Sequence, residues 1–151
     1  MRIVADTNIW VSGLLWRGMP WKLLCLAETG QVELCLALPM LAELAEVLNY
    51  GRIRSRLEQL SITTNDLVAF ALRLASLFEA SEGDPIVQAD PDDNIFLWCA
   101  TAASAAYVVS GDRHLLDLGT YAGIPIVTVH DFFATEFPDQ LEQPPNADPA
   151  V

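Results

Sequence analysis

The sequence predicts an α/β fold with a central parallel sheet. Short apolar runs rich in β-branched residues alternate along the chain with longer segments whose apolar residues recur at helical spacing. Such runs are typical of strands buried on both faces, as in parallel sheets covered by helices. Two of them, residues 2–5 and 107–109, are followed directly by polar residues that include Asp6 and Asp112. Because ligand crevices in open parallel sheets form at the carboxyl ends of the strands, we expect a functional site at this edge.

The chain has the length and the apolar content of one domain. Its 151 residues are 52% hydrophobic, which is enough for a sizeable core. We expect one domain over residues 1–137 and a disordered, acidic and proline-rich tail over residues 138–151, which has little to bury. No apolar run reaches the roughly 18 residues of a membrane span, and the N-terminal segment lacks the pattern of a secretory signal. These features predict a cytoplasmic protein.

The charge balance restricts how the chain can bind nucleic acid. The formal net charge is −12, from 8 basic and 20 acidic residues. This balance argues against a broad basic surface, so a polyanion would have to be held through divalent cations or a local arginine cluster. The cysteines Cys25, Cys35 and Cys99 each lie in an apolar segment without CxxC spacing, which predicts reduced core residues.

The first half of the chain alternates strands with helices. Residues 2–5 and 33–37 are the expected strands, and Pro39 suits the first turn of the helix after the second one. In that helix Glu43 borders the apolar stripe, whereas Glu46 lies further round towards solvent. Glu43 therefore either faces the sheet or reaches water from its boundary position. The helices expected in this half span residues 9–15, 21–28 and 39–49.

The second half begins with an arginine cluster at residues 51–56, which allows two interpretations. It is either a solvated turn between helices or a rim that contacts phosphate groups. After it, Thr63 and Asp66 resemble a capping box at the start of a helix. Further helices are expected at residues 67–78, 95–106, 115–118 and 130–137, and further strands at 107–109 and 124–129. A loop is expected over residues 79–89, with a short strand-like entry at 77–80.

Aspartates cluster before the helix expected at residues 95–106. Asp90, Asp92 and Asp93 fit the positive end of a helix macrodipole, so one interpretation is simple capping. Asp93, however, projects on the same helical face as Phe96 and should point towards the sheet. Asp90 or Asp92 is then the better cap.

Asp6 has the same ambiguity. Asp, Thr and Asn are all good N-cap residues, so Asp6 could merely cap the helix that leaves the first strand. Thr7 or Asn8 can also serve as the cap, which would leave Asp6 to face a metal ion.

Four acids from separate elements should meet at one edge of the sheet: Asp6, Glu43, Asp93 and Asp112. Clustered carboxylates raise one another's pKa values unless a cation compensates their charge. Oxygen ligands without His or Cys favour Mg²⁺ or Mn²⁺ over zinc. The set therefore predicts metal-assisted hydrolysis of a phosphodiester bond, in which the metal activates water and orients the phosphate.

The motifs around these acids occur together in a recognisable order. They are residues 4–8 (VADTN), 39–48 with Leu41-Ala42-Glu43-Leu44, 90–94 (DPDDN) and 110–116 (SGDRHLL). In combination they resemble a PIN domain ribonuclease, and most closely the toxins of VapC-like toxin–antitoxin pairs. The resemblance covers about residues 1–137. It implies a three-layer sandwich with a parallel sheet of about five strands flanked by helices, and an endoribonuclease that uses Mg²⁺ or Mn²⁺.

The resemblance also assigns roles to individual residues. The catalytic acids it implies are Asp6, Glu43, Asp93 and Asp112, of which Asp6, Asp93 and Asp112 are the expected metal ligands. The supporting positions are Thr7, Asn8, Asp90, Asn94 and Ser110. The candidate RNA contacts are Arg52, Arg54, Arg56 and Arg113.

Two points of the alignment stay open. Many relatives have a further acid two residues after the last motif aspartate, where this chain has His114, so a second metal site is in doubt. The spacing of some relatives, counted back from Asp112, also reaches Asn94 instead of Asp93. The inward helical face favours Asp93.

The resemblance implies three partners: an RNA substrate, a second copy of the chain in a homodimer, and a neutralising protein antitoxin. Large apolar residues near the first two helices are candidates for a partner surface, although at least half of them should be core: Trp10, Trp16, Met19 and Trp21. A tryptophan that is fully buried within the monomer cannot belong to that surface.

Other functions remain possible on the sequence alone. A PIN fold without catalysis would be a module that binds RNA or protein. A receiver-type signalling domain also gathers aspartates around Mg²⁺, but it needs a lysine near its end and the chain has only Lys22. A haloacid-dehalogenase phosphatase needs an acid two residues after Asp6, where this chain has Asn8.

Overall fold

The computed structural model describes residues 1–80 and 91–141, which form a sheet covered by helices. The strands are β1 (Arg2–Ala5), β2 (Glu33–Leu36), β3 (Ser76–Leu77), β4 (Tyr107–Val109), β5 (Thr120–Tyr121) and β6 (Ile124–Val127). Their order across the sheet is β3-β2-β1-β4-β6-β5, and every pairing is parallel except that of β5 with β6. The predicted α/β class with a central, mostly parallel sheet is confirmed.

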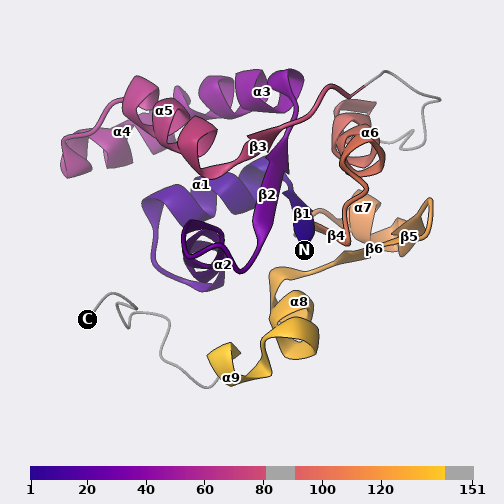
Figure 1. The fold of residues 1–151 in the computed structure, drawn as a ribbon. Coiled ribbons are helices and arrows are strands. Elements are labelled where there is room, and N and C mark those ends of the chain that lie inside the picture. The colour runs from indigo at the N-terminus through magenta and orange to yellow at the C-terminus, as the bar shows by residue number, and fades with distance from the viewer. Residues whose placement is uncertain (81–90, 142–151) are drawn as a thin grey trace.

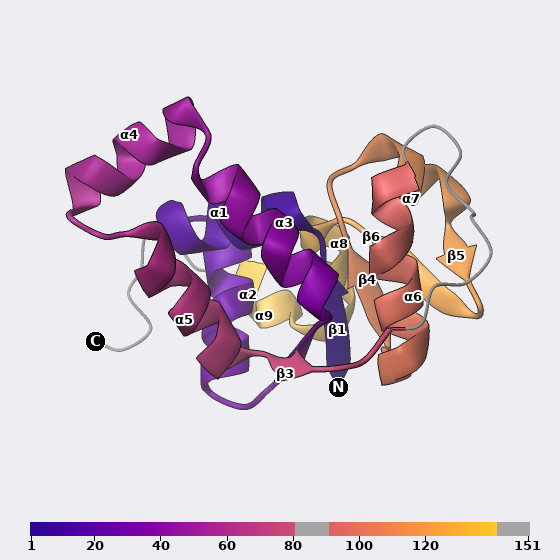
Figure 2. The same ribbon diagram turned by 90° about the horizontal axis from the view of Figure 1, so that it is seen from above.

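Helices cover both faces of this sheet. In Figure 1, α6 lies above the strands and α8 below them, which makes three layers. The α-helices are α1 (Thr7–Leu15), α2 (Met19–Glu28), α3 (Leu38–Leu48), α4 (Gly51–Leu60), α5 (Thr64–Leu74), α6 (Asn94–Ala103), α7 (Arg113–Leu118), α8 (Val129–Glu136) and α9 (Pro138–Leu141), and a 3₁₀ turn, η1 (Pro91–Asp93), precedes α6. In both views α4 lies at the opposite end of the molecule from α7 (Figures 1 and 2).

The pairing of β1 with β4 sets the position of the site. Ala5 pairs with Val109, so the residues that follow each strand leave the sheet side by side. The backbone N–H of Asp6 donates to the carbonyl of Val109 at 3.1 Å, which continues the ladder by one residue. Asp6 and Ser110 are thus brought together by strand register, although more than a hundred residues separate them in sequence.

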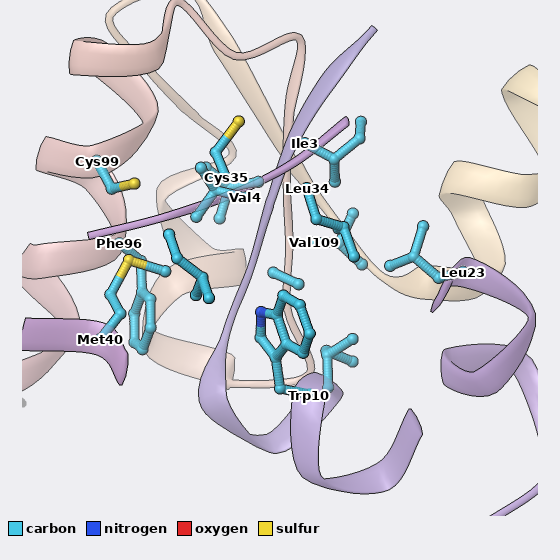
Figure 3. Packing of buried hydrophobic residues seen from close by; sticks show 14 of the residues in the cluster. Ile3, Val4, Trp10, Leu23, Leu34, Cys35, Met40, Phe96, Cys99 and Val109 are labelled. Atoms are coloured by element: carbon cyan, nitrogen blue, oxygen red, sulfur yellow. The ribbon is translucent and has the colours of Figure 1, made fainter. Parts of the chain in front are cut away.

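The core lies on both sides of β1. Ile3, Val4 and Ala5 are completely buried, as expected of a strand with two covered faces. Figure 3 shows Trp10 packed among aliphatic side chains beside this strand. Trp10 is only 1% exposed and is therefore excluded from a partner surface, whereas Trp16 is 44% exposed.

The thiols behave as the sequence predicts for core cysteines. All three are free, and Cys35 and Cys99 are buried while Cys25 is half-buried. Burial raises the pKa of Cys35 to about 11 and that of Cys99 to about 12. These two thiols are therefore protonated and unreactive at neutral pH.

Several elements differ from the sequence-based expectation. The arginine-rich segment forms α4 where a turn was one interpretation, because Ile53 and Leu57 bury a stripe at i, i+4 spacing. The helix after Thr63 ends at Leu74, since Ser76 and Leu77 pair with β2. The strand β5 was not expected, because it has only two residues.

The C-terminal boundary also differs. The expected tail begins at Pro138, but Pro138–Leu141 form α9, which packs against α8. Residues 142–151 lie outside the described residues, as do Asp90 and residues 81–89, for which a loop was expected. Within the part of the chain that the structure describes, no helix has both the length and the apolarity that crossing a membrane requires.

Candidate functional site at the carboxyl ends of β1 and β4

Asp6 occupies the end of β1 and is only 3% exposed. Its Oδ1 accepts a hydrogen bond from the Ile9 N–H at 2.9 Å, which caps α1. Its Oδ2 accepts from the Ser110 hydroxyl and from the Gly111 N–H. Burial raises the pKa of Asp6 above 3.8, although these hydrogen bonds oppose the shift. Of the cap residues that the sequence allowed, the structure shows Asp6 and not Thr7 or Asn8, and the same side chain also lies in the site.

Ser110 joins Asp6 to Asp112. Its side chain is completely buried, and its Oγ accepts from the Asp112 N–H at 2.9 Å while donating to Asp6. Asp112 is the N-cap of α7, where its Oδ1 accepts from the N–H groups of His114 at 2.8 Å and Leu115 at 3.3 Å. One carboxylate oxygen is therefore directed at the helix. His114 itself is exposed.

Glu43 reaches the site from α3. The hydroxyl of buried Thr7 donates to Glu43 Oε2 at 3.0 Å, which connects the start of α1 to the middle of α3. This bond holds the half-buried carboxylate at the carboxyl edge of the sheet. Thr7 was predicted only as a supporting residue, and the structure gives it a specific contact.

Asp93 closes the site from the side of α6. It is 9% exposed, and it stands at the N-cap position of α6 without a capping hydrogen bond from its side chain. The following residue, Asn94, is 2% exposed. The side chain of Asp93 is thus not used to cap its own helix.

The four acids line one small pocket of about 120 Å³. Asp93 belongs to this pocket, whereas Asn94 lines a larger neighbouring hollow of about 710 Å³. The residues around the small pocket are Asp6, Thr7, Asn8, Glu43, Val47, Asp93, Phe96 and Asp112. Sequence reasoning missed Val47, which lies four residues after Glu43 and therefore on the same face of α3.

The family model described as PIN domain matches residues 2–114, a range that runs from β1 into α7 and contains all four acids. This chain belongs to the PIN domain family. PIN domains are generally nucleases, and the family's nucleases generally use divalent metal ions. A comparison with curated proteins found no match.

The donor set of this PIN domain suits a hard divalent cation in its chemistry. The candidate ligand atoms on its wall are carboxylate, hydroxyl and amide oxygens, with no His or Cys among the described lining residues. In those same residues, no three acids, histidines or cysteines lie close enough together to hold a metal ion as a group. Mg²⁺ commonly binds through one or two carboxylates and completes its shell with water and substrate oxygens, so the pocket fits such an ion.

None of the three arginines in the cluster at residues 51–56 lines the pocket of this PIN domain. Arg56 donates to the carbonyl of Leu15 from Nε at 3.3 Å and from Nη2 at 3.2 Å, so it attaches α4 to α1. Arg52 and Arg54 are exposed on α4. Arg113 is also exposed and directly follows Asp112, which makes it the candidate RNA contact nearest to the acids in sequence.

Proposed function

We propose that this PIN domain is a metal-dependent endoribonuclease that hydrolyses RNA phosphodiester bonds. The convergence of Asp6, Glu43, Asp93 and Asp112 on one pocket carries the proposal. The PIN family assignment also removes the receiver and phosphatase alternatives that the sequence left open.

The proposed ligands of the ion are Asp6, Asp93 and Asp112. One or two of these carboxylates would bind the ion directly, and water and substrate oxygens would complete its shell. When bound, Mg²⁺ or Mn²⁺ would supply a Lewis acid that neutralises phosphate charge and lowers the pKa of a water molecule. This also explains how a chain with a net charge of −12 could hold a polyanion.

The chain's own residues have distinct tasks in this proposal. Ser110 and the Gly111 N–H orient Asp6 and favour its charged form, which a metal ligand needs. Thr7 orients Glu43, which we propose accepts a proton from the attacking water.

The test is cleavage of a mixed RNA pool in Mg²⁺, in Mn²⁺ and in EDTA. We expect Asp6→Asn and Asp93→Asn to cleave about 100-fold or more slowly than wild type, and EDTA to abolish cleavage.

Asp117→Asn changes an exposed acid outside the pocket and is the matched control. Equal rates in all four proteins would refute the assignment, and a silent wild type would favour a binding module without catalysis. Loss in Asn94→Ala with normal cleavage by Asp93→Asn would identify Asn94 as the motif residue.

We further propose that the domain is the toxin of a toxin–antitoxin pair and forms a homodimer. The motif resemblance supports this, and Trp16 with half-buried Trp21 remains available for a partner surface. Expression of the wild type should stop bacterial growth, whereas expression of Asp6→Asn should not.

For the homodimer, light scattering should give twice the mass of one chain. A monomeric mass would contradict the homodimer.

A further inference from the structure

A groove between α3 and α6 adjoins the acid pocket. It has a volume of about 710 Å³, within the roughly 300–1,000 Å³ usual for ligand pockets, whereas the acid pocket has only about 120 Å³. Glu43 and Val47 line both spaces, so the two are adjacent. A group bound in this groove, which we call the α3–α6 groove, would therefore be adjacent to a phosphodiester at the acids.

The walls of the α3–α6 groove combine aromatic rings with acceptors. Tyr50 follows α3 and is 55% exposed, and Trp98 of α6 is half-buried. The charged side chains on the described wall are all acidic, among them Glu46, and the groove also contains the amide of Asn94. A phosphate would be repelled by this wall, whereas a neutral planar ring with N–H donors would match it.

We propose that the α3–α6 groove binds an unpaired nucleobase of the RNA whose phosphodiester lies at the acid pocket. The inference rests on the proposed ribonuclease function and names a specificity subsite for it. The base stacks on Tyr50, because aromatic side chains bind any base through its π-face. Its amino group donates to Glu46, as acidic side chains do for the cytosine N4 amine. Cytosine, adenine and guanine carry such an amine. Uracil has only the ring N3–H, which lies between two carbonyl oxygens that the carboxylate would repel, so the groove disfavours uracil.

The first experiment measures base binding without phosphate, metal or cleavage. Saturation-transfer NMR in EDTA is recorded with the four uncharged nucleosides. We expect signals from the base protons of cytidine, adenosine and guanosine, and weaker signals from uridine. Tyr50→Ala should weaken binding roughly 5- to 100-fold, while Tyr50→Phe keeps it. Tyr121→Ala removes another tyrosine ring outside the groove and should have no effect.

The same samples decide between a base and a protein segment as the occupant. An acidic groove with aromatic walls also suits an arginine-containing peptide. Binding of a tri-arginine peptide without any nucleoside signal would overturn the proposal. Equal nucleoside binding by Tyr50→Ala and wild type would overturn it too, provided that thermal melting shows both proteins to be folded.

The second experiment separates this inference from the proposed function. Cleavage in Mg²⁺ is compared on RNAs that differ only in the base next to the scissile bond. We expect wild type to discriminate against uracil and Glu46→Gln to lose most of that discrimination while still cleaving. If wild type cleaves and the base preference is the same in Tyr50→Ala and Glu46→Gln, the function stands and the groove proposal fails. If nucleosides bind but no RNA is cleaved, the groove proposal survives and the ribonuclease assignment fails.

Discussion

Asp6 combines a structural and a chemical role in one carboxylate. Its Oδ1 caps α1 through the Ile9 N–H, and its Oδ2 faces Ser110 and Gly111 beside the other acids. Burial is the largest influence on its pKa and raises it, so the charged form is held at a cost in folding free energy. A cation in the pocket would compensate for that cost.

The raised pKa of Asp6 predicts a pH dependence of stability in metal-free buffer. Above pH 3.8 the Asp6 carboxyl group loses its proton in the unfolded chain. In the folded chain it keeps the proton until the pH reaches its higher pKa. Wild-type stability from this group therefore falls as pH rises through that window. The free energy of unfolding of Asp6→Asn minus that of wild type should increase over the same window, measured by denaturant unfolding in EDTA.

Asp66 is an opposite-sign control for this measurement. Its pKa is lowered, mainly by the hydrogen bond from the Thr63 N–H at 3.0 Å. The stabilising contribution of Asp66 is present above pH 3.8. It is lost as the pH falls through the lower pKa that Asp66 has in the folded chain. The free energy of unfolding of Asp66→Asn minus that of wild type should therefore decrease as pH rises. The same sign in both variants would show that burial does not dominate at Asp6.

Thr7 predicts a positioning effect on Glu43. Thr7→Val keeps the shape of the side chain but removes the hydroxyl that donates to Glu43 Oε2. A hydrogen bond to a charged group contributes about 1.5–3 kcal/mol. If its loss raises the activation free energy by that amount, kcat for RNA cleavage should fall about 10-fold or more. Thr7→Ser retains the hydroxyl and should cleave at close to the wild-type rate. Equal rates for Thr7→Val and Thr7→Ser would show that this bond does not position Glu43.

At the scale of elements, α1 and α2 depend on a close approach at Gly13. A Cβ at this position would lie 2.8 Å from Leu24 Cδ1 and 2.9 Å from the Pro20 carbonyl oxygen. The Leu24 side chain could shift, but the backbone carbonyl could not shift without moving the helix. The absence of a side chain at Gly13 therefore sets how closely the two helices pack.

Gly13→Ala should accordingly destabilise the fold by about 1–3 kcal/mol, the usual cost of overpacking a well-filled site. Gly51→Ala is the control, because a Cβ there meets nothing within 4 Å and alanine has the higher helix propensity in α4. Chemical denaturation should show a lower midpoint for Gly13→Ala and an unchanged or higher one for Gly51→Ala. An unchanged midpoint for Gly13→Ala would mean that α1 and α2 are more loosely packed.

Most elements were predictable from local pattern. The strands β1, β2 and β4 and the capping box of α5 followed from apolar runs and cap residues that act within a few positions. The elements that were missed depend on distant partners. Two-residue β5 exists only through its antiparallel pairing with β6, and α4 is held by Ile53 and Leu57 against the core.

At the scale of the whole molecule, α9 connects the end of the described chain to α2. Lys22 is 6% exposed, and its ammonium group donates to the Gln140 carbonyl at 2.7 Å. A buried ammonium needs acceptors, since burial of a charge without hydrogen bonds costs several kcal/mol. This contact and the packing on α8 hold α9 against the rest of the domain.

A chain that ends at Phe137 should therefore melt a few °C or more below one that ends at Leu141. The shorter chain removes an acceptor from buried Lys22 and the packing of α9 on α8. In a Lys22→Met background the difference between the two lengths should shrink, because no ammonium then needs the acceptor. Differential scanning calorimetry of the four proteins checks this, and equal melting temperatures for the two lengths would contradict it.

The sequence by itself determined the fold class, the edge that carries the site and the candidate acids. The reason is that an apolar strand ending in an acid is a local pattern, and parallel strands bring such ends to one edge. Only the tertiary structure decided that Asp6 is also the cap, that Thr7 holds Glu43 and that Arg56 attaches to Leu15. It alone revealed the α3–α6 groove beside the acids. These features depend on helix packing and strand register between residues far apart in sequence, which periodicity and cap signals do not encode.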